Sequence, residues 1–442
     1  MELYSCEADY VNTLKTRADL PDGFRTATAS LKFLPAEKPA GELYPMNLSL
    51  ILLEKPTAAF AGVFTRNSFP GAPIHLARRR MLGAETQGVL INNKVSNVCA
   101  PGGLADAEEI LASLSGDLAA RTEAVPGLKG INPSRLFMAS TGIIGWRLPV
   151  EEIKNNLPRL AASAADGGSS ARSCFDASRA VMTTDSFPKI RKAAVGGGSI
   201  VAFAKGAGMI EPNLATMLVF IMTDLTLPRD LMQKVLAETV RDTFNTISID
   251  SDQSTSDMVL FFSSCMKPQP QESAFRQGLL SVCRDLADDI VRNGEGTGHV
   301  IKVSVNGAPS SEAALGAGKA VINSPLVKTA IFGNDPNVGR IIGALGDYAG
   351  SGGLELDRDR VVIRLGEEII FRQGEFALDA EKEKQLAAYL KHAAFNPEIK
   401  GFPQHDRSVR ITLDLNMGAF SAAVTGSDLS YEYVRENADY RS

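Results

Sequence analysis

A chain of 442 residues is long enough for two or three domains with substantial hydrophobic cores. Its composition, 44% apolar and 22% charged, is ordinary for a soluble globular protein, and a formal net charge of −5 argues against a nucleic-acid or anionic-membrane partner. The five scattered cysteines form no CxxC pair and the four histidines show no HExxH-like spacing, which argues against a disulfide framework and a zinc site.

The amino-terminal residues and the apolar runs indicate in which compartment the protein is expected. The first ten residues, MELYSCEADY, are acidic and lack the apolar region of a secretory signal. The apolar run around Leu218–Met222 is too short to span a bilayer. We therefore expect a reduced, cytoplasmic protein. The basic run Arg78–Arg80 is expected to be a solvated helix face, with a substrate or subunit contact as the alternative.

The first half of the chain alternates short apolar runs with glycine and proline. A continuous apolar run predicts a strand at Thr86–Asn92, and helical spacing of apolar residues predicts a helix at Leu104–Ser115. Leu136–Gly145 is expected to be a strand broken by a Ser-Thr-Gly turn. The small residues of Ala161–Arg172 suggest a linker or surface loop.

The second half mixes strands with amphipathic helices and contains no internal repeat. Strands are expected at Leu218–Asp224, Val300–Gly307, Val409–Gly418 and in a hairpin at Arg360–Gln373, and helices at Pro228–Phe244, Phe275–Arg292 and Glu381–Phe395. The order lacks a strict strand–helix–strand rhythm. It favours layered α/β packing over a dinucleotide-binding sheet.

The stretch AKGAGMIEPNLATMLVFIMTD, Ala204–Asp224, places a threonine between a glycine-rich loop and a buried strand. A phosphate-binding loop is disfavoured because the pattern GxxxxGK[ST] is absent. The glycines of Val195–Val201 also fail to form a dinucleotide fingerprint, and they fit a hairpin turn better.

The remaining chemical possibility is a threonine nucleophile at Thr216. A threonine hydroxyl needs an adjacent base, and an amino-terminal threonine carries one in its own α-amine. The pKa of that amine is about 7.7–8.0, against about 10.4 for lysine, so a useful fraction is neutral near pH 7. The chain would have to cut itself between Ala215 and Thr216. From these residues alone, a threonine that simply opens a strand is the commoner explanation.

A resemblance to a known family favours the threonine nucleophile over a threonine that simply opens a strand. KGAGMIEPNLATML, Lys205–Leu218, resembles the self-processing motif of the ornithine acetyltransferase family of arginine biosynthesis, in which cleavage precedes the threonine. Further segments resemble that family in the same order: ASTGIIG (Ala139–Gly145), MTTDSFPK (Met182–Lys189), NGEGTGHVIKV (Asn293–Val303), FGNDPNVGRI (Phe332–Ile341) and the tail DLSYEYVRENADYRS (Asp428–Ser442). The likeness thus extends over nearly all of the chain.

The resemblance implies a site. Thr216 would be the nucleophile for self-cleavage and for acetyl transfer, and the Thr141 hydroxyl with the Gly142 N–H would stabilise the oxyanion. The resemblance assigns substrate contacts to six residues: Thr183, Lys205, Thr216, Glu295, Asn437 and Ser442. Lys205 suits a substrate carboxylate and Glu295 an ammonium group.

The resemblance also implies a reaction and an assembly. N-acetylornithine would acylate Thr216, ornithine would leave, and glutamate would accept the acetyl group, with no metal or organic cofactor. Whether acetyl-CoA also serves as donor separates bifunctional from monofunctional members, and both remain open. The implied fold is a layered α/β, or αββα, sandwich with a smaller carboxyl-terminal α/β lobe. Fragments 1–215 and 216–442 would stay associated and form an α2β2 assembly.

Some positions depart from the family pattern. Glu211 stands where histidine or a small residue is expected, and its carboxylate could repel glutamate or attract an amine. Val338 replaces an expected tryptophan, the segment Ala422–Tyr431 lacks another, and Asn92–Gly103 matches only loosely. Two kinds of alternative follow. One is an acyl transferase, or an amidohydrolase or aminopeptidase, of the same fold that acts on a different N-acyl amino acid, and the other is a binding or regulatory protein without catalysis.

Overall fold

The computed structural model describes residues 3–211, 217–352 and 354–439, apart from the side chain of Ser169. Ala215, Thr216 and Ser442, which the sequence singles out, lie outside the described residues.

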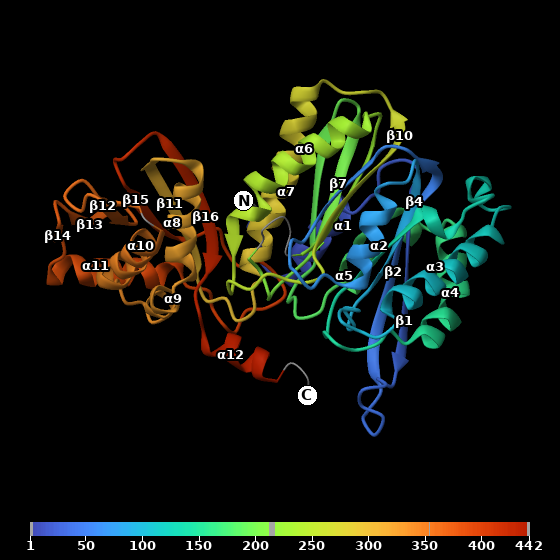
Figure 1. Ribbon diagram of the computed structural model, residues 1–442, viewed down its shortest axis with the longest axis horizontal. Helices are drawn as coiled ribbons and strands as arrows, with labels where there is room; N and C mark the ends of the chain where they lie inside the picture. Colours follow the sequence, from blue (N-terminus) through green and yellow to red (C-terminus); the bar gives the residue numbers. More distant parts are fainter. Residues whose placement is uncertain (1–2, 212–216, 353, 440–442) are drawn as a thin grey trace.

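Two sheets make up the larger lobe (Figure 1). The first has the order β1 (Phe24–Phe33), β2 (Tyr44–Thr57), β4 (Thr86–Asn92), β5 (Leu136–Ser140). The second has the order β3 (Phe60–Phe64), β10 (Met258–Lys267), β8 (Leu218–Leu225), β7 (Gly198–Lys205), β6 (Lys189–Val195). β8 is therefore the central strand of its sheet.

The two sheets pack face to face because their strands are apolar on both faces. In β2, Leu50 and Leu52 point to the outer helices whereas Ile51 and Leu53 point to the second sheet, as the two-residue repeat of a strand requires. Between the sheets, the rings of Phe137 of β5 and Phe262 of β10 lie 5.9 Å apart, centroid to centroid. This is the middle interface of a four-layered sandwich.

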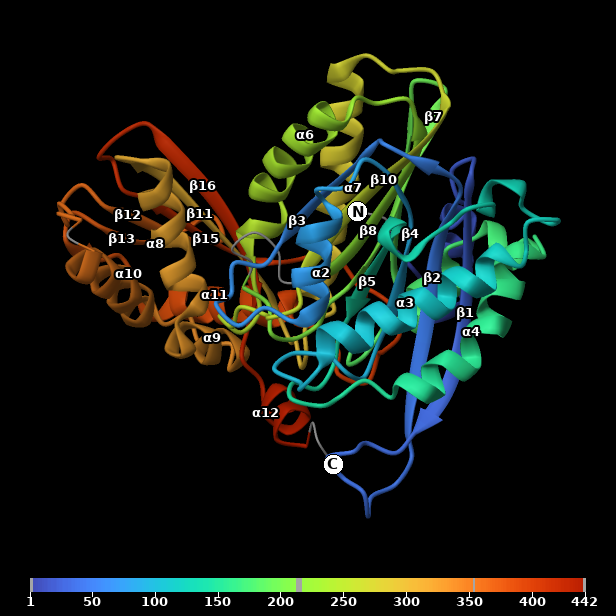
Figure 2. The ribbon, with the colours of Figure 1, turned by 45° about the vertical axis from the view of Figure 1, so that its right-hand side comes forward.

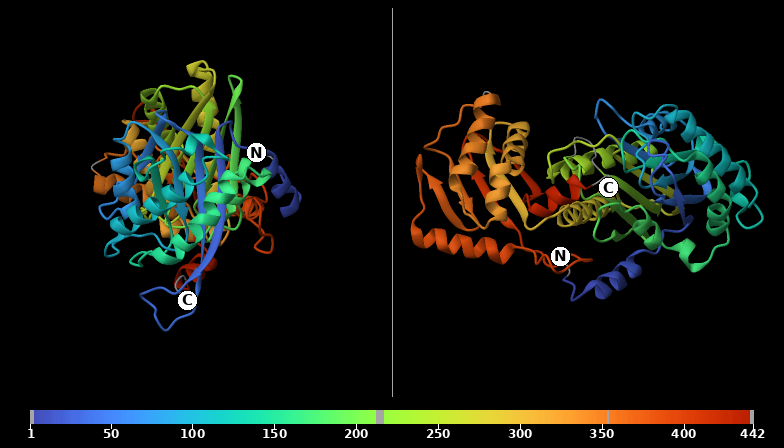
Figure 3. Two further views of the ribbon diagram at one scale, coloured as in Figure 1. Left: turned by 90° about the vertical axis from the view of Figure 1, so that its right-hand side faces the viewer. Right: turned by 90° about the horizontal axis from the view of Figure 1, so that it is seen from below.

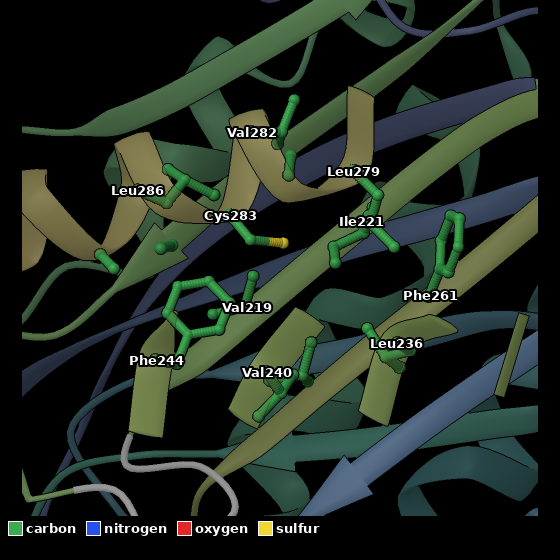
Figure 4. Packing of buried hydrophobic residues seen from close by; sticks show 14 of the residues in the cluster. Val219, Ile221, Leu236, Val240, Phe244, Phe261, Leu279, Val282, Cys283 and Leu286 are labelled. Carbon is green, nitrogen blue, oxygen red and sulfur yellow. The ribbon is translucent and has the colours of Figure 1, made fainter. Parts of the chain in front are cut away.

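Helices form the two outer layers. α3 (Gly103–Ala119) and α4 (Val150–Ala165) cover the first sheet, and α6 (Arg229–Asp242) and α7 (Glu272–Arg292) cover the second (Figures 1 and 2). Figure 4 shows this packing on the second sheet, with side chains of α6 and α7 meeting those of β8 and β10: Val219, Ile221, Leu236, Val240, Phe261, Leu279 and Cys283.

A smaller lobe follows α7 (Figure 3). Its seven-stranded sheet has the order β14 (Glu375–Phe376), β13 (Glu368–Arg372), β12 (Val362–Leu365), β15 (Val409–Asp414), β11 (Val300–Ala308), β16 (Phe420–Ser427), β9 (Ile247–Ser248). Its core also includes residues of α8 (Ser311–Asn323), α9 (Pro325–Phe332), α10 (Val338–Gly352) and α11 (Ala380–Ala393). From this lobe, α12 (Tyr431–Ala438) extends back beneath the junction with the larger lobe (Figure 1).

The remaining elements are short: α1 (Glu7–Arg17), α2 (Ala72–Arg80), α5 (Phe175–Ala180) and the 3-10 helices Pro126–Leu128, Pro133–Arg135, Ser169–Arg172 and Phe244–Thr246. The basic run Arg78–Arg80 forms the last turn of α2 with Arg78 and Arg79 exposed, as predicted. Among the described residues, no helix is both long enough and apolar enough to cross a membrane.

Most sequence predictions of elements are confirmed. The strand Thr86–Asn92 is β4, the predicted helices at 104–115 and 275–292 are α3 and α7, and a glycine turn joins β12 to β13. The layered αββα fold with a smaller carboxyl-terminal lobe is also confirmed. The prediction of a linker or surface loop at 161–172 was wrong for residues 161–165, whereas residues 166–172 do leave the helix and contain only the short 3-10 helix Ser169–Arg172. α4 continues to Ala165 because Ala161, Ala164 and Ala165 extend its buried stripe, and alanine is the best helix former.

The predicted boundary between residues 215 and 216 falls between β7 and β8. These strands are antiparallel neighbours, with Lys205 paired to Leu218. Fragments 1–215 and 216–442 would therefore share one sheet, the first supplying β3, β6 and β7 and the second β8 and β10.

Candidate active site

A cavity of about 260 Å³ lies where β5 and β7 end and β8 begins. Every predicted site residue among the described ones lines it: Thr141, Gly142, Thr183, Lys205, Glu295 and Asn437. Met217, the residue after Thr216, lines it as well. Five segments that are far apart in the sequence thus converge at the start of the central strand.

The turn after β5 is fixed by backbone contacts. The N–H of Thr141 donates to the carbonyl of Asn92 (3.1 Å), and that of Ile143 to the carbonyl of Lys94 (2.9 Å). Gly142 has φ +125°, and a Cβ there would lie 2.1 Å from the carbonyl carbon of Lys94, so this position requires glycine. Within the described part of the chain the Gly142 N–H has no acceptor. A turn held this way can present a donor to an oxyanion.

The buried carboxylate of Asp185 joins two segments that line the cavity. The ammonium of Lys189 lies 2.5 Å from Asp185, and both side chains are fully buried. Asp185 also accepts the N–H of Thr183 (3.1 Å) and that of Gly206 (2.9 Å). Burial alone would raise the pKa of Asp185, but the charges of Lys189 and Lys205 and these hydrogen bonds lower it to about 2. The carboxylate therefore stays ionised and positions Thr183 and Lys205.

Glu295 is held from three sides. Its N–H donates to the carbonyl of Ala207 (2.8 Å), and its carboxylate accepts Thr184 Oγ1 (2.7 Å) and Asn437 Nδ2 (2.8 Å). A Cβ on Gly208 would lie 2.2 Å from Oε2 of Glu295, so the glycine allows the loop to approach the carboxylate. With Lys205 in the same cavity, the site presents opposite charges at fixed positions, which suits a zwitterionic amino acid.

A further group, Asp250, was missed by sequence reasoning. Its carboxylate accepts the backbone N–H groups of Met209 (2.6 Å) and Ile210 (2.7 Å) and the hydroxyl of Tyr433 (3.3 Å). Burial raises the pKa of Asp250, although the backbone hydrogen bonds oppose this shift. Asp250 thus links the glycine loop that precedes residues 212–216 to α12, which carries Asn437.

Glu211 makes its contacts away from the cavity. Its carboxylate lies 3.2 Å from the ammonium of Lys319 and accepts Nδ2 of Asn323 (2.7 Å), both on α8, and Glu211 does not line the cavity. Glu211 therefore forms a contact between the two lobes, instead of the substrate contact that the sequence suggested. Val338 is buried in the core of the smaller lobe, so the missing tryptophan changes packing there.

His299 is buried and hydrogen-bonded, whereas two other histidines are exposed. Nδ1 of His299 lies 2.7 Å from Asp428 and its Nε2 lies 3.2 Å from the carbonyl of Leu390, in the buried interior. His75 and His392 are exposed. Within residues 3–211, 217–352 and 354–439, no group of three or more His, Cys, Asp or Glu residues could hold a metal ion.

Comparison with known proteins gives the family. The model of the ArgJ family matches residues 40–442. The chain belongs to the ArgJ family. This confirms the family expected from the motifs around Thr216. Among curated ArgJ relatives, "Arginine biosynthesis bifunctional protein ArgJ" of Bartonella quintana is 36% identical over 411 residues, which cover 90% of this chain and 91% of the relative.

Two further relatives extend the comparison. "Glutamate N-acetyltransferase" of Methanosarcina mazei is 38% identical over 408 residues, covering 89% of this ArgJ-family chain and 94% of the relative. A crystal structure of arginine biosynthesis bifunctional protein argJ from Bacillus halodurans is 34% identical and covers 51% of this chain and 100% of that chain, with a TM-score of 0.44.

Proposed function

We propose that this chain is an acetyltransferase of arginine biosynthesis that moves the acetyl group of N-acetylornithine to glutamate. Membership of the ArgJ family and the names of its relatives support this activity. The observation that carries the proposal is the cavity at the start of β8, in which the Thr141–Gly142 turn, Lys205 and Glu295 meet beside Met217.

The proposed cycle begins with self-cleavage. The hydroxyl of Thr216 attacks the carbonyl carbon of Ala215 and the C–N bond between the two residues breaks, which moves the acyl group onto oxygen and frees the α-amine of Thr216. Water then hydrolyses this ester, which leaves a carboxylate on Ala215 and restores the hydroxyl of Thr216. That amine then accepts the proton of the hydroxyl of its own residue. The flanking glycines permit the backbone geometry that such attack needs.

Acetyl transfer then proceeds in two steps. Oγ of Thr216 attacks the acetyl carbon of N-acetylornithine, the C–N bond breaks, and the α-amine returns its proton to the departing ornithine. The amine of glutamate attacks the acetyl-Thr216 ester, gives up a proton, and releases Thr216 as N-acetylglutamate forms. Both steps pass through a tetrahedral oxyanion, for which the Thr141 hydroxyl and the Gly142 N–H are suited donors.

Charge complementarity supports the choice of substrates. Lys205 receives the substrate carboxylate, and Glu295 receives an ammonium group of ornithine. Thr183, Asn437 and Ser442 add neutral hydrogen bonds. Because fragments 1–215 and 216–442 would divide one sheet between β7 and β8, they stay associated, and we propose an α2β2 assembly. Acetyl-CoA as a second donor would make the enzyme bifunctional.

Thr216→Ala tests the proposal, with Thr216→Ser as the matched control. On a denaturing gel the wild type should give two bands and Thr216→Ala a single full-length band, while Thr216→Ser retains a hydroxyl and should still be cut. Purified wild type should turn over N-acetylornithine repeatedly only when glutamate is present, and without glutamate it should consume no more than about one equivalent per site. Acetate release without glutamate would identify a hydrolase instead, and an uncut wild-type chain after prolonged incubation would contradict the proposed nucleophile.

A further inference from the structure

A second cavity, of about 560 Å³, adjoins the candidate active site. Thr184 and Glu295 line both cavities. The lining of the second one includes the Asn293–Gly298 turn, the loop at 395–404 and residues of α12. Apart from Glu295, no described residue with a role proposed for acetyl transfer lines the second cavity.

The most buried charged residue that lines this cavity is Arg292, the last residue of α7. Its side chain is only 2% exposed. Among the described residues, neither Nε nor Nη1 of Arg292 has a hydrogen-bond acceptor. The nearest carboxylate oxygen, on Asp288 one turn earlier in the same helix, lies 3.7 Å from Nη1, which is too long for a hydrogen bond. Buried polar groups nearly always have partners, so these donors point to an anionic ligand.

The cavity lining also carries negative charge. Glu432 and Glu436 of α12 line the cavity and are exposed. Burial and the neighbouring Glu295 raise the pKa of Glu436, and Lys400, which lines the cavity too, opposes this shift. Phe332 and Phe395 supply apolar lining. The cavity thus offers partners for a carboxylate and for ammonium groups, together with apolar surface.

We propose that this cavity is a second binding site for a dibasic α-amino acid, whose α-carboxylate pairs with Arg292 and whose ammonium groups pair with Glu432 and Glu436. The size of the cavity is within the range of small-molecule sites, about 300–1,000 Å³. Binding at this site does not depend on the proposed acetyl transfer.

Calorimetric titration of the full chain tests the site, with L-lysine as the probe. Cadaverine, which is lysine without its carboxylate, is the matched control ligand. The Lys205→Met variant removes the carboxylate partner of the first cavity, so binding that it retains belongs elsewhere. We expect Lys205→Met to bind L-lysine at one site, cadaverine at least about tenfold more weakly, and the double variant Lys205→Met/Arg292→Gln to lose at least about tenfold in affinity.

A second variant guards against a folding defect at the buried arginine. Ile399 lines the cavity from the loop and is 40% exposed, so Ile399→Trp should fold normally and reduce binding by filling the cavity. L-Lysine binding that is lost in Lys205→Met would overturn the proposal by placing the ligand in the first cavity. Equal affinity for L-lysine and cadaverine, no saturable binding, or binding unchanged by Ile399→Trp would also overturn it. None of these results depends on whether acetyl transfer occurs.

Discussion

The turn at Gly142 offers a sharp test of the proposed oxyanion site. In Gly142→Ala the new Cβ would lie 2.1 Å from the carbonyl carbon and 2.3 Å from the carbonyl oxygen of Lys94. Carbon atoms in contact are normally about 3.5–4.0 Å apart, so the backbone must shift by more than about 1 Å. An oxyanion donor has to lie within about 2.7–3.1 Å of the developing charge, so the shifted N–H would no longer reach it.

The expected loss follows from that geometry. Removal of one oxyanion donor typically lowers kcat about 100- to 1,000-fold, and we expect a loss in this range for Gly142→Ala. The assay is glutamate-dependent consumption of N-acetylornithine by the cleaved fraction of the protein, because the same donor would also serve self-cleavage.

Gly145→Ala is the matched control in the same turn. Gly145 also has a positive φ, +89°, but an added Cβ there has no atom within 4 Å among the described residues. Both variants carry the backbone strain, about 1–2 kcal/mol, whereas only Gly142→Ala carries the clash. Gly145→Ala should therefore keep kcat within about threefold of wild type. Equal losses in the two variants, or a normal kcat in Gly142→Ala, would refute the role of Gly142.

Three other substitutions follow from the contacts around the site. Asp185→Asn leaves the buried ammonium of Lys189 without its counter-charge, so we expect a loss of about 3–5 kcal/mol in the free energy of unfolding, measured by urea denaturation. The pKa of Asp185 is about 2 in the folded protein and about 3.9 in the unfolded chain, so the stabilisation that it gives wild type is complete above about pH 4 and is lost as the pH falls toward 2. Asp185→Asn should flatten this loss of stability at acid pH. An unchanged loss would count against the ion pair. Tyr433→Phe removes the hydroxyl that Asp250 accepts, and should raise KM several-fold with little change in global stability; an unchanged KM would show that this link does not position α12. Glu211→Gln should leave the KM for both substrates within about twofold, since its carboxylate faces α8, and a changed substrate preference would contradict this placement.

The sequence predicted helices and strands well where the apolar residues follow a single pattern, either the helical spacing or a continuous run. β4 is apolar at consecutive positions because both of its faces are buried, and α7 repeats a helical stripe over five turns. The residues after Leu160 were predicted as a loop because the glycines and serines at 167–170 are typical of loops, although the alanines before them favour a helix. Those alanines lie against the first sheet, a tertiary contact that composition does not reveal.

Sequence motifs predicted which residues form the site, but only the fold shows how these residues lie relative to one another. The resemblance to the family's motifs singled out Lys205 and Glu295, and the structure brings both into one cavity. Asp250 could not be found this way, because it lies in a polar run, Ser248–Asp257, in which several acids and serines look equivalent. Its role follows from long-range hydrogen bonds, since Asp250 accepts two backbone N–H groups of the glycine loop and the hydroxyl of Tyr433. The contact of Glu211 with α8 likewise depends on how the two lobes meet.

Intact-mass measurement of the purified protein, before and after addition of N-acetylornithine without glutamate, tests the central claim most directly. Two polypeptides should be found, the second beginning at Thr216, and this second one alone should gain the mass of one acetyl group, which later addition of glutamate removes. A single uncut chain, or an acetyl group found on the fragment that ends at Ala215, would contradict the claim that a freed threonine carries the acyl group.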